Sequence, residues 1–325
     1  MAQSLHDLND LRTPEFHKSV TDEDYLRQLN QRLSSESENY IDKEPNHPFI
    51  FVFGLPRSGT TITAQLLAYH LKCSFINNVS ARFWLAPVTG IALSRILLSQ
   101  EAQPQMGSNY AETPSLTGLH EFGYFWRHWL QLNRIEDFTR LEEIVEQVDW
   151  AGLRKTLVNI QQAENRPMVM KNIFGAHFLP RFLKEFPQSI FVYIQRDLAD
   201  VAVSILNARM KFYGNPDTWW STIPPDYKEL EHLKGAEQVA GQVASLSEFY
   251  NGMIASTEDS NRVIRVNLAD LCRTPKSVSE KIISSCNSLF GKQIELASEP
   301  PESLPFRNYQ EDQHYSFFNS KLSPG

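Results

Sequence analysis

The feature that most constrains the fold is a short loop at residues 54–61, which reads Gly-Leu-Pro-Arg-Ser-Gly-Thr-Thr and directly follows the apolar run 49–53. A continuous apolar run of this length is typical of a strand buried on both faces of a parallel sheet. Residues 60–71 carry apolar side chains at helical spacing, so the loop joins a buried strand to a helix. Such a junction directs backbone N–H groups and the positive end of the helix dipole at one anion. We therefore expect a phosphate-like group to bind here.

The position of the positive charge distinguishes this loop from that of a P-loop kinase. The Gly-x-x-x-x-Gly spacing is present, but Thr60 stands where a kinase has lysine, and the basic residue is Arg57. A kinase needs that lysine beside the transferred phosphoryl group and a metal ion held by the next hydroxyl. The sequence therefore argues against phosphoryl transfer from ATP.

Residues 56–61 resemble the 5′-phosphosulfate loop of the sulfotransferases that use 3′-phosphoadenosine 5′-phosphosulfate (PAPS), whose pattern is Pro-[Lys/Arg]-[Ser/Thr]-Gly-[Ser/Thr]-[Ser/Thr]. The resemblance implies that Arg57 meets the bridging oxygen of the donor. It also implies a set of donor-binding residues in the loop, namely Arg57, Ser58, Gly59, Thr60 and Thr61.

A second element of the same family follows the apolar run 189–194. Arg196 stands at the end of this predicted strand, and Ser204 comes eight positions later on the predicted helix. The family binds the 3′-phosphate with an arginine and a serine at this spacing. Open α/β sheets bind ligands along the carboxyl edge of their strands, where both elements are expected to lie. The resemblance therefore implies that Arg196 and Ser204 hold the 3′-phosphate.

The resemblance covers most of residues 48–292, and the pattern of elements agrees with it. Apolar strands are expected at 49–53, 168–170, 189–194 and 262–266, and helices at 118–132, 139–163 and 275–289, among others. Strands that alternate with helices predict a parallel sheet with helices on both faces. We expect an α/β, three-layer, P-loop-like sandwich with a central parallel sheet.

The domain organisation is expected to be one domain with additions. Residues 1–47 are polar, with a helical pattern from about 21 to 33, and predict an N-terminal helical arm. Residues 48–325 form the sulfotransferase domain in this interpretation. Within it, the stretch 207–235 is rich in proline, glycine and aromatic residues, and we expect it to be a lid over the active face.

The catalytic residues are less well defined than the donor site. Lys171, at the end of the strand 168–170, is a second candidate, after Arg57, for the cation that stabilises the leaving oxygen. The resemblance gives no base: relatives place a histidine two residues after this lysine, where this chain has Ile173, or a glutamate after the phosphate-loop helix, where it has none. The remaining candidates are His120 and Glu121, which we favour, and Glu112 and His177.

Composition limits the cofactors and partners. The net charge of −7 argues against nucleic acid as a partner. Three widely spaced cysteines and an N-terminus without an apolar block favour a reduced, cytoplasmic protein. We expect PAPS as the donor, its product PAP (3′-phosphoadenosine 5′-phosphate), no metal, and a small or carrier-bound hydroxyl acceptor. The oligomeric state and the acceptor's identity stay open.

Two other functions remain as alternatives at this point. The first is a P-loop nucleotide kinase or NTPase-like enzyme, against which the missing lysine counts. The second is a non-catalytic sulfonucleotide-binding protein, which the absence of a base at the family's usual positions keeps open. Binding of PAP without Mg²⁺ separates the family from the kinase, and turnover of PAPS excludes the non-catalytic protein.

Overall fold

The sheet is the centre of the computed structural model, which describes residues 9–35, 40–99, 106–107, 115–291 and 294–323. Its four strands are all parallel and stand in the order β2-β1-β3-β4. They are β1 (Phe49–Gly54), β2 (Met168–Lys171), β3 (Ser189–Gln195) and β4 (Val263–Asn267). The expected α/β sandwich with a central parallel sheet is confirmed, and the strands lie within a residue or two of their predicted positions.

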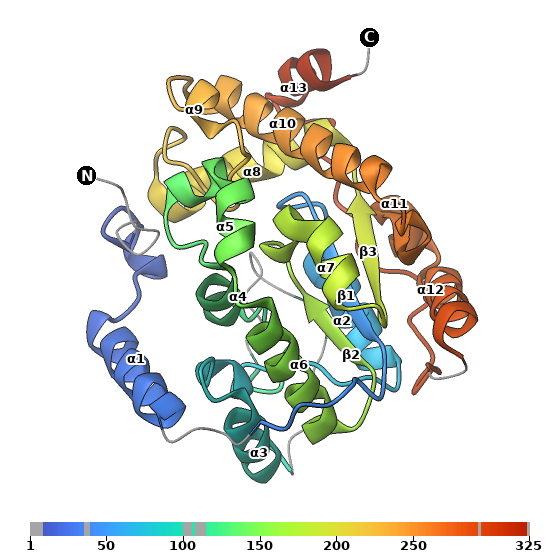
Figure 1. Ribbon diagram of the computed structural model, residues 1–325. Coiled ribbons are helices and arrows are strands. Elements are labelled where there is room, and N and C mark those ends of the chain that lie inside the picture. Colours follow the sequence, from blue (N-terminus) through green and yellow to red (C-terminus); the bar gives the residue numbers. More distant parts are fainter. Residues whose placement is uncertain (1–8, 36–39, 100–105, 108–114, 292–293, 324–325) are drawn as a thin grey trace.

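Each face of the sheet carries its own hydrophobic core, because successive side chains of a strand point to opposite faces. Phe49, Phe51 and Phe53 pack in one core, and Ile50 and Val52 in the other. The first core lies under α6 (Trp150–Glu164), α7 (Leu179–Glu185), α8 (Leu198–Tyr213) and α10 (Gly235–Ser256). The second lies under α2 (Thr60–His70), α11 (Leu268–Arg273) and α12 (Pro275–Phe290). Figure 1 shows these helices on the two sides of the strands.

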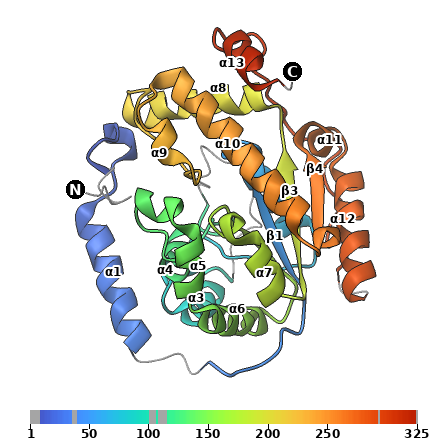
Figure 2. The same cartoon turned by 45° about the horizontal axis from the view of Figure 1, so that its top comes forward.

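The other helices surround this sandwich. They are α1 (Val20–Ser35), α3 (Pro87–Leu97), α4 (Gly123–Leu130), α5 (Leu141–Gln147), α9 (Tyr227–Leu230) and α13 (Tyr315–Leu322). Figures 1 and 2 both show α1 at the outside of the molecule, away from the sheet. Figure 2 also shows α13 beside α8, with which it is in contact.

Two helix predictions are wrong in their bounds. The helix expected at 118–132 begins only at Gly123, because the chain before it is bonded to residues 76–78: Asn78 N donates to Gly118 O (3.0 Å) and His120 N donates to Ile76 O (2.8 Å). The helix expected at 139–163 is divided into α5 and α6. At the break, the Asp149 side chain accepts the Gly152 N–H (2.8 Å) and caps α6, so a new helix starts there.

The segment 207–235 is part helix and part loop. α8 extends to Tyr213 and ends at Gly214, whose left-handed conformation (φ 63°) suits glycine. The following loop is anchored rather than loose: Trp219 is buried, and Ile223 O is 3.0 Å from Nε2 of the buried His177. The role of this segment as a lid stays a prediction.

No helix in the described part of the chain is long and apolar enough to cross a membrane.

Candidate active site

Close packing explains the two glycines of the phosphate loop. A side chain at Gly54 would bring its Cβ to 2.6 Å from Ile194 O and 2.7 Å from Ser58 Oγ. At Gly59, which precedes α2 with φ 99°, a Cβ would lie 2.4 Å from Leu268. Arg57 also takes a left-handed conformation (φ 67°), which is uncommon for a residue with a Cβ. The backbone conformation of the phosphate loop therefore depends on this close packing at Gly54 and Gly59.

Ser58 fits an anion-binding role. Its side chain is fully buried, and its Oγ has no hydrogen-bond partner among the described residues. Buried hydroxyls in native proteins almost always have a partner, protein or otherwise. An oxygen of a bound 5′-phosphosulfate group would accept this hydrogen bond, so the loop fits the ligand that the sequence implies.

Lys171 and Glu121 meet at the start of α2. Lys171 is the last residue of β2 and is buried, and its Nζ donates to Thr61 Oγ1 (2.8 Å). The same Nζ forms an ion pair with Glu121 Oε1. The half-exposed Glu121 carboxylate and the buried ammonium group therefore lie together beside the phosphate loop.

A strained residue holds this carboxylate in place. Phe122, directly after Glu121, is in the left-handed conformation (φ 58°), which is costly for an aromatic residue. Its ring is stacked on Phe125, with centroids 4.4 Å apart, and its N–H donates to His120 Nδ1 (2.8 Å). These contacts fix the backbone turn that places Glu121 toward Lys171.

His120 is a neutral donor in this arrangement. Burial lowers the pKa of His120 to about 4, so the ring is uncharged near neutral pH. Because Nδ1 accepts the Phe122 N–H, the single ring proton must be on Nε2. The outward nitrogen of His120 can therefore donate a hydrogen bond, but it has no lone pair to take a proton.

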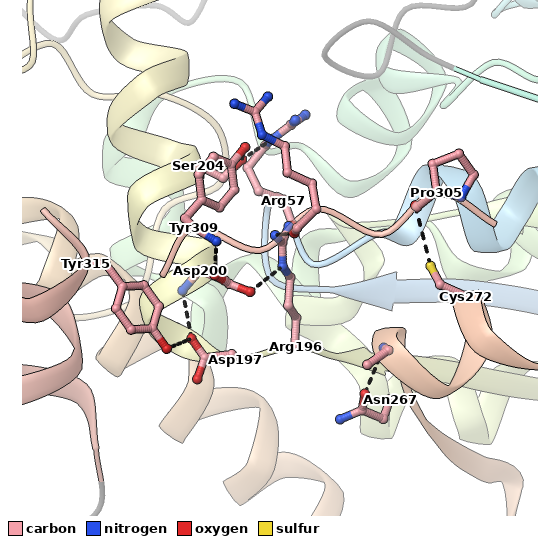
Figure 3. Close-up of polar contacts among 12 residues, drawn as sticks. Arg57, Arg196, Asp197, Asp200, Ser204, Asn267, Cys272, Pro305, Tyr309 and Tyr315 are labelled. Atoms are coloured by element: carbon pink, nitrogen blue, oxygen red, sulfur yellow. Dashed lines mark hydrogen bonds and ion pairs between the residues drawn. The ribbon is translucent and has the colours of Figure 1, made fainter. Parts of the chain in front are cut away.

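Arg57, Arg196 and Ser204 form one corner at the carboxyl edge of the sheet (Figure 3). Arg57 Nε donates to Ser204 Oγ (3.0 Å), although the two residues are 147 positions apart. Arg196 Nη1 donates to Arg57 O (2.9 Å) and so connects this corner to the phosphate loop. The two elements that the sequence assigns to the donor are brought into direct contact.

Two residues of this corner were not predicted from the sequence. Asp200 Oδ2 is 3.6 Å from Arg196 Nε, and Asp200 Oδ1 accepts the Tyr309 N–H (2.7 Å). Tyr309 also places its hydroxyl 3.4 Å from Ser204 Oγ and its ring under the Arg196 guanidinium, 5.5 Å from its centroid (Figure 3). The spacing from Arg196 to Asp200, one helical turn, is a usable sequence signal, but Tyr309 gives none.

The family resemblance also implies a late basic residue that closes on the 3′-phosphate, for which Arg307 is the candidate. Arg307 lies at this corner through its backbone. Its carbonyl accepts a hydrogen bond from Arg196 Nη2, while its exposed guanidinium lies 4.8 Å from the centroid of the Tyr309 ring.

Of the two other base candidates, the structure places His177 in the core, away from this centre. His177 is fully enclosed: its Nε2 is 3.0 Å from Ile223 O, and burial lowers the pKa of His177 to about 4. It packs against Phe138 and Tyr250 as a core residue. Glu112 lies outside the described residues.

The aromatic residues of 122–129 and 212–220 are candidates, from the sequence, for the lining of an acceptor pocket, but most of them are in the core instead. The buried ones are Phe122, Phe125, Trp126, Phe212 and Trp219. Tyr124 is the exception among the residues of α4, because it lines a cavity together with Trp84. Among the described residues, no group of three His, Cys, Asp or Glu side chains is placed to hold a metal ion.

Comparison with known proteins identifies the family. Residues 48–290 match the profile described as the sulfotransferase family. The fold is similar to that of sulfotransferase STF1 from Mycobacterium tuberculosis, with a TM-score of 0.54 and 14% identity over 94% of this chain and 85% of that one. It is also similar to sulfotransferase STF9 from Mycobacterium avium, with a TM-score of 0.53 and 15% identity over 86% and 76% of the two chains. A search of curated proteins gave no match.

Proposed function

The chain belongs to the sulfotransferase family, and from this premise we propose that it takes the sulfuryl group of PAPS, transfers it to a hydroxyl of a small or carrier-bound acceptor, and releases PAP. The observation that carries the proposal is the corner formed by Arg57, Arg196 and Ser204 beside the phosphate loop. An ATP-using enzyme has no use for a second phosphate site there, whereas PAPS carries phosphate groups on both the 5′ and 3′ positions.

The residues present suit both ends of this donor. The buried Ser58 hydroxyl and the N–H groups at the start of α2 would hold the 5′-phosphosulfate. Arg196, Ser204 and Tyr309 would hold the 3′-phosphate, with Asp200 fixing the Arg196 guanidinium in place. Bound PAPS supplies an activated sulfuryl group and a leaving group that is a stable anion.

We propose that Glu121 is the general base. The acceptor oxygen forms a bond to sulfur, its proton passes to the Glu121 carboxylate, and the bond from sulfur to the bridging oxygen breaks, leaving its electron pair on PAP. The carboxylate is half-exposed and lies beside the phosphate loop, because it pairs with Lys171, which in turn donates a hydrogen bond to Thr61 of the loop. His120 is unsuited to this role, because its outward nitrogen carries the proton. It would instead donate a hydrogen bond to the acceptor.

Arg57 and Lys171 would stabilise the charge that develops on the leaving oxygen. Cations placed in advance in a partly dry site act strongly on such a charge. Lys171 is buried and Arg57 is half-buried. These two groups and the backbone amides supply the positive potential, so the proposal includes no metal ion.

The three cysteines, Cys73, Cys272 and Cys286, are free and buried. Free thiols suit a reducing compartment, and we propose the cytoplasm. The lid role of residues 207–235 and the division into an arm (1–47) and a domain (48–325) are parts of the same proposal.

Ligand-dependent thermal stability tests the donor assignment. PAP without Mg²⁺ should raise the melting temperature much more than ATP at the same concentration, because only PAP occupies the Arg196–Ser204 corner. Equal shifts from ATP and PAP would overturn the proposal in favour of the NTPase-like alternative. Transfer of radioactive sulfate from PAPS to any hydroxyl acceptor then excludes a non-catalytic binding protein.

A further inference from the structure

A cluster of positive charge lies under the arm, on the side of Glu121 away from the donor. Lys18 Nζ donates to Tyr124 Oη (2.8 Å), and the same hydroxyl donates to the Glu23 carboxylate. Lys18 also pairs with Glu23 at 3.4 Å. The arm is therefore attached to α4 through polar groups, within one helical turn of Glu121.

Arg12 and Arg127 add two cations to this cluster. Both act electrostatically on Lys18 and on Tyr124. The Nε atoms of both arginines are buried and have no hydrogen-bond partner among the described residues. The terminal guanidinium group of Arg127 reaches Asn133 O at 3.4 Å, a long contact, whereas that of Arg12 donates to Phe16 O (3.3 Å) and also hydrogen-bonds to the Tyr213 side chain. The donor capacity of Arg127 is therefore poorly used.

The nearby carboxylates do not balance these charges. Glu23 is shared between Lys18 and Tyr124. Asp137, which also acts on Arg127, accepts the N–H groups of Asn133 (2.8 Å) and Arg134 (2.7 Å). Three cations thus face two carboxylates, Glu23 and Asp137, and burial lowers the pKa of Lys18 and of Arg127. An additional anion at this place would be favourable.

A cavity of about 280 Å³ opens onto the cluster. The residues that bound it include Glu23 and Arg27 of α1, Trp84, and Tyr124, Arg127 and His128 of α4. The Trp84 and Tyr124 rings have centroids 4.8 Å apart and form an apolar wall next to the charged groups. This volume suits a small ring or a short chain that ends in a polar group.

The cluster is close to the catalytic groups. Glu121, Lys171 and Lys18 all act electrostatically on His120. Tyr124, which lines the cavity, follows Glu121 by only three positions. In this proposal, an acceptor whose hydroxyl reaches Glu121 extends toward Tyr124 and the cavity.

Resting on the proposed function, we infer that the acceptor carries an anionic group, a carboxylate or a phosphate, which Arg127 binds in the cavity between α1 and α4. Lys18, which contacts the lining residue Tyr124, and Arg12 add positive potential beside the cavity. The hydroxyl to be sulfated is at the other end of the acceptor, next to Glu121. The arm then contributes directly to acceptor selection, because Arg12, Lys18 and Glu23 all belong to it.

The test is calorimetric binding of three small probes to enzyme saturated with PAP, so that the donor site cannot bind them. Phenyl phosphate and benzoate represent the two anionic groups, and benzamide is a neutral match for benzoate. We expect at least one anionic probe to bind at least tenfold more tightly than benzamide. Tighter binding of phenyl phosphate indicates a phosphate on the acceptor, and tighter binding of benzoate a carboxylate.

Charge-removing variants locate the binding. Arg127→Gln and, separately, Lys18→Met should weaken the preferred anion about tenfold to a hundredfold, the range for a lost charge-assisted hydrogen bond. Arg273→Gln is the matched control: it removes the same charge from an exposed site that pairs with Asp270. It should change the affinity less than twofold.

The affinity for PAP, measured in the same samples, reports folding and separates the two proposals. If PAP does not bind the wild type, the proposed function fails. If PAP binds but benzamide binds as well as both anions, or if Arg127→Gln and Lys18→Met weaken anion binding no more than Arg273→Gln does, this inference alone is overturned.

Discussion

The phosphate loop is enclosed by the parallel sheet, whereas α1, the part of the arm that borders the cavity, is held by a few polar contacts. Next to the loop, β1 pairs with both β2 and β3 along its length, and each of its residues is buried. In α1, by contrast, Asn30 is the one described residue that is fully buried. Its side chain donates to Arg82 O (2.8 Å) and accepts the Leu85 N–H (2.9 Å).

In the proposed function, this difference separates the sites of the two substrates. The proposed donor edge is held by strands and both cores, so its geometry exists before a ligand arrives. On the arm side, α1 buries little apolar surface and can open at low free energy. We therefore expect substitutions at the donor edge to lower the transfer rate equally for every acceptor. The effect of substitutions on the arm side should instead differ from one acceptor to another.

Glu121→Gln, at the boundary between the two sides, should have the largest effect. The amide keeps the shape but cannot take the proton, so single-turnover sulfuryl transfer should fall on the order of 10²–10⁴-fold. PAP binding should not weaken, because the donor contacts remain. Glu143→Gln, which alters an exposed ion pair, is the control. A loss below tenfold would remove Glu121 as the base.

Arg57→Ala tests whether the donor edge acts in the chemical step or only in binding. If its cation stabilises the leaving oxygen, transfer at saturating PAPS should fall on the order of 10²–10³-fold, more than PAP affinity does. A near-normal rate combined with a weaker Kd would mean that Arg57 only neutralises the ground state, and Lys171 would take its place.

Arg196→Ala should weaken PAP binding by about 1.5–3 kcal/mol, the range for a charge-assisted hydrogen bond. Calorimetry measures this, with circular dichroism to show that the variant is folded. Arg265→Ala is the control, since Arg265 is exposed on β4, where it bonds to Asn251 rather than to the corner. Unchanged PAP affinity in folded Arg196→Ala would exclude the 3′-phosphate assignment.

Asn30→Leu should loosen the arm and leave the donor edge intact. The substitution leaves Arg82 O and Leu85 N without this partner, at a local cost of about 1–3 kcal/mol. Amide exchange in α1 should become faster, while PAP affinity stays within about twofold. Gln28→Leu, at an exposed position of the same helix, is the control. A matching loss of PAP affinity would show that the two sides are not independent.

His120→Asn should have the smallest effect. The asparagine oxygen can still accept the Phe122 N–H, and the pKa of His120, about 4 against the usual value near 6.5, keeps the ring neutral from pH 5 to 9. The transfer rate should therefore fall less than about fivefold, and the pH profile should keep its shape. If the transfer rate of the wild type falls below pH 6–7 and that of His120→Asn does not, His120 is the base after all.

The sequence by itself determined the donor edge. The strand, loop and helix at 49–71 are specified by apolar periodicity and two glycines, and Arg196 and Ser204 are eight positions apart on a strand end and a helix. These features depend on neighbouring residues, whose backbone geometry is regular, so a pattern along the chain is enough to place them.

The contacts that join distant parts of the candidate site, at the donor corner as well as around Glu121, follow from the tertiary structure. Lys171 reaches Glu121 and Thr61 from 50 and 110 positions away, and Tyr309 reaches Asp200 from 109. The expected helix at 118–132 was wrong for the same reason: hydrogen bonds to residues 76–78 hold its first residues in another conformation, and no local propensity reports such bonds. Long-range contacts follow from the order of strands in the sheet and the packing of helices upon it, which the chain specifies only as a whole.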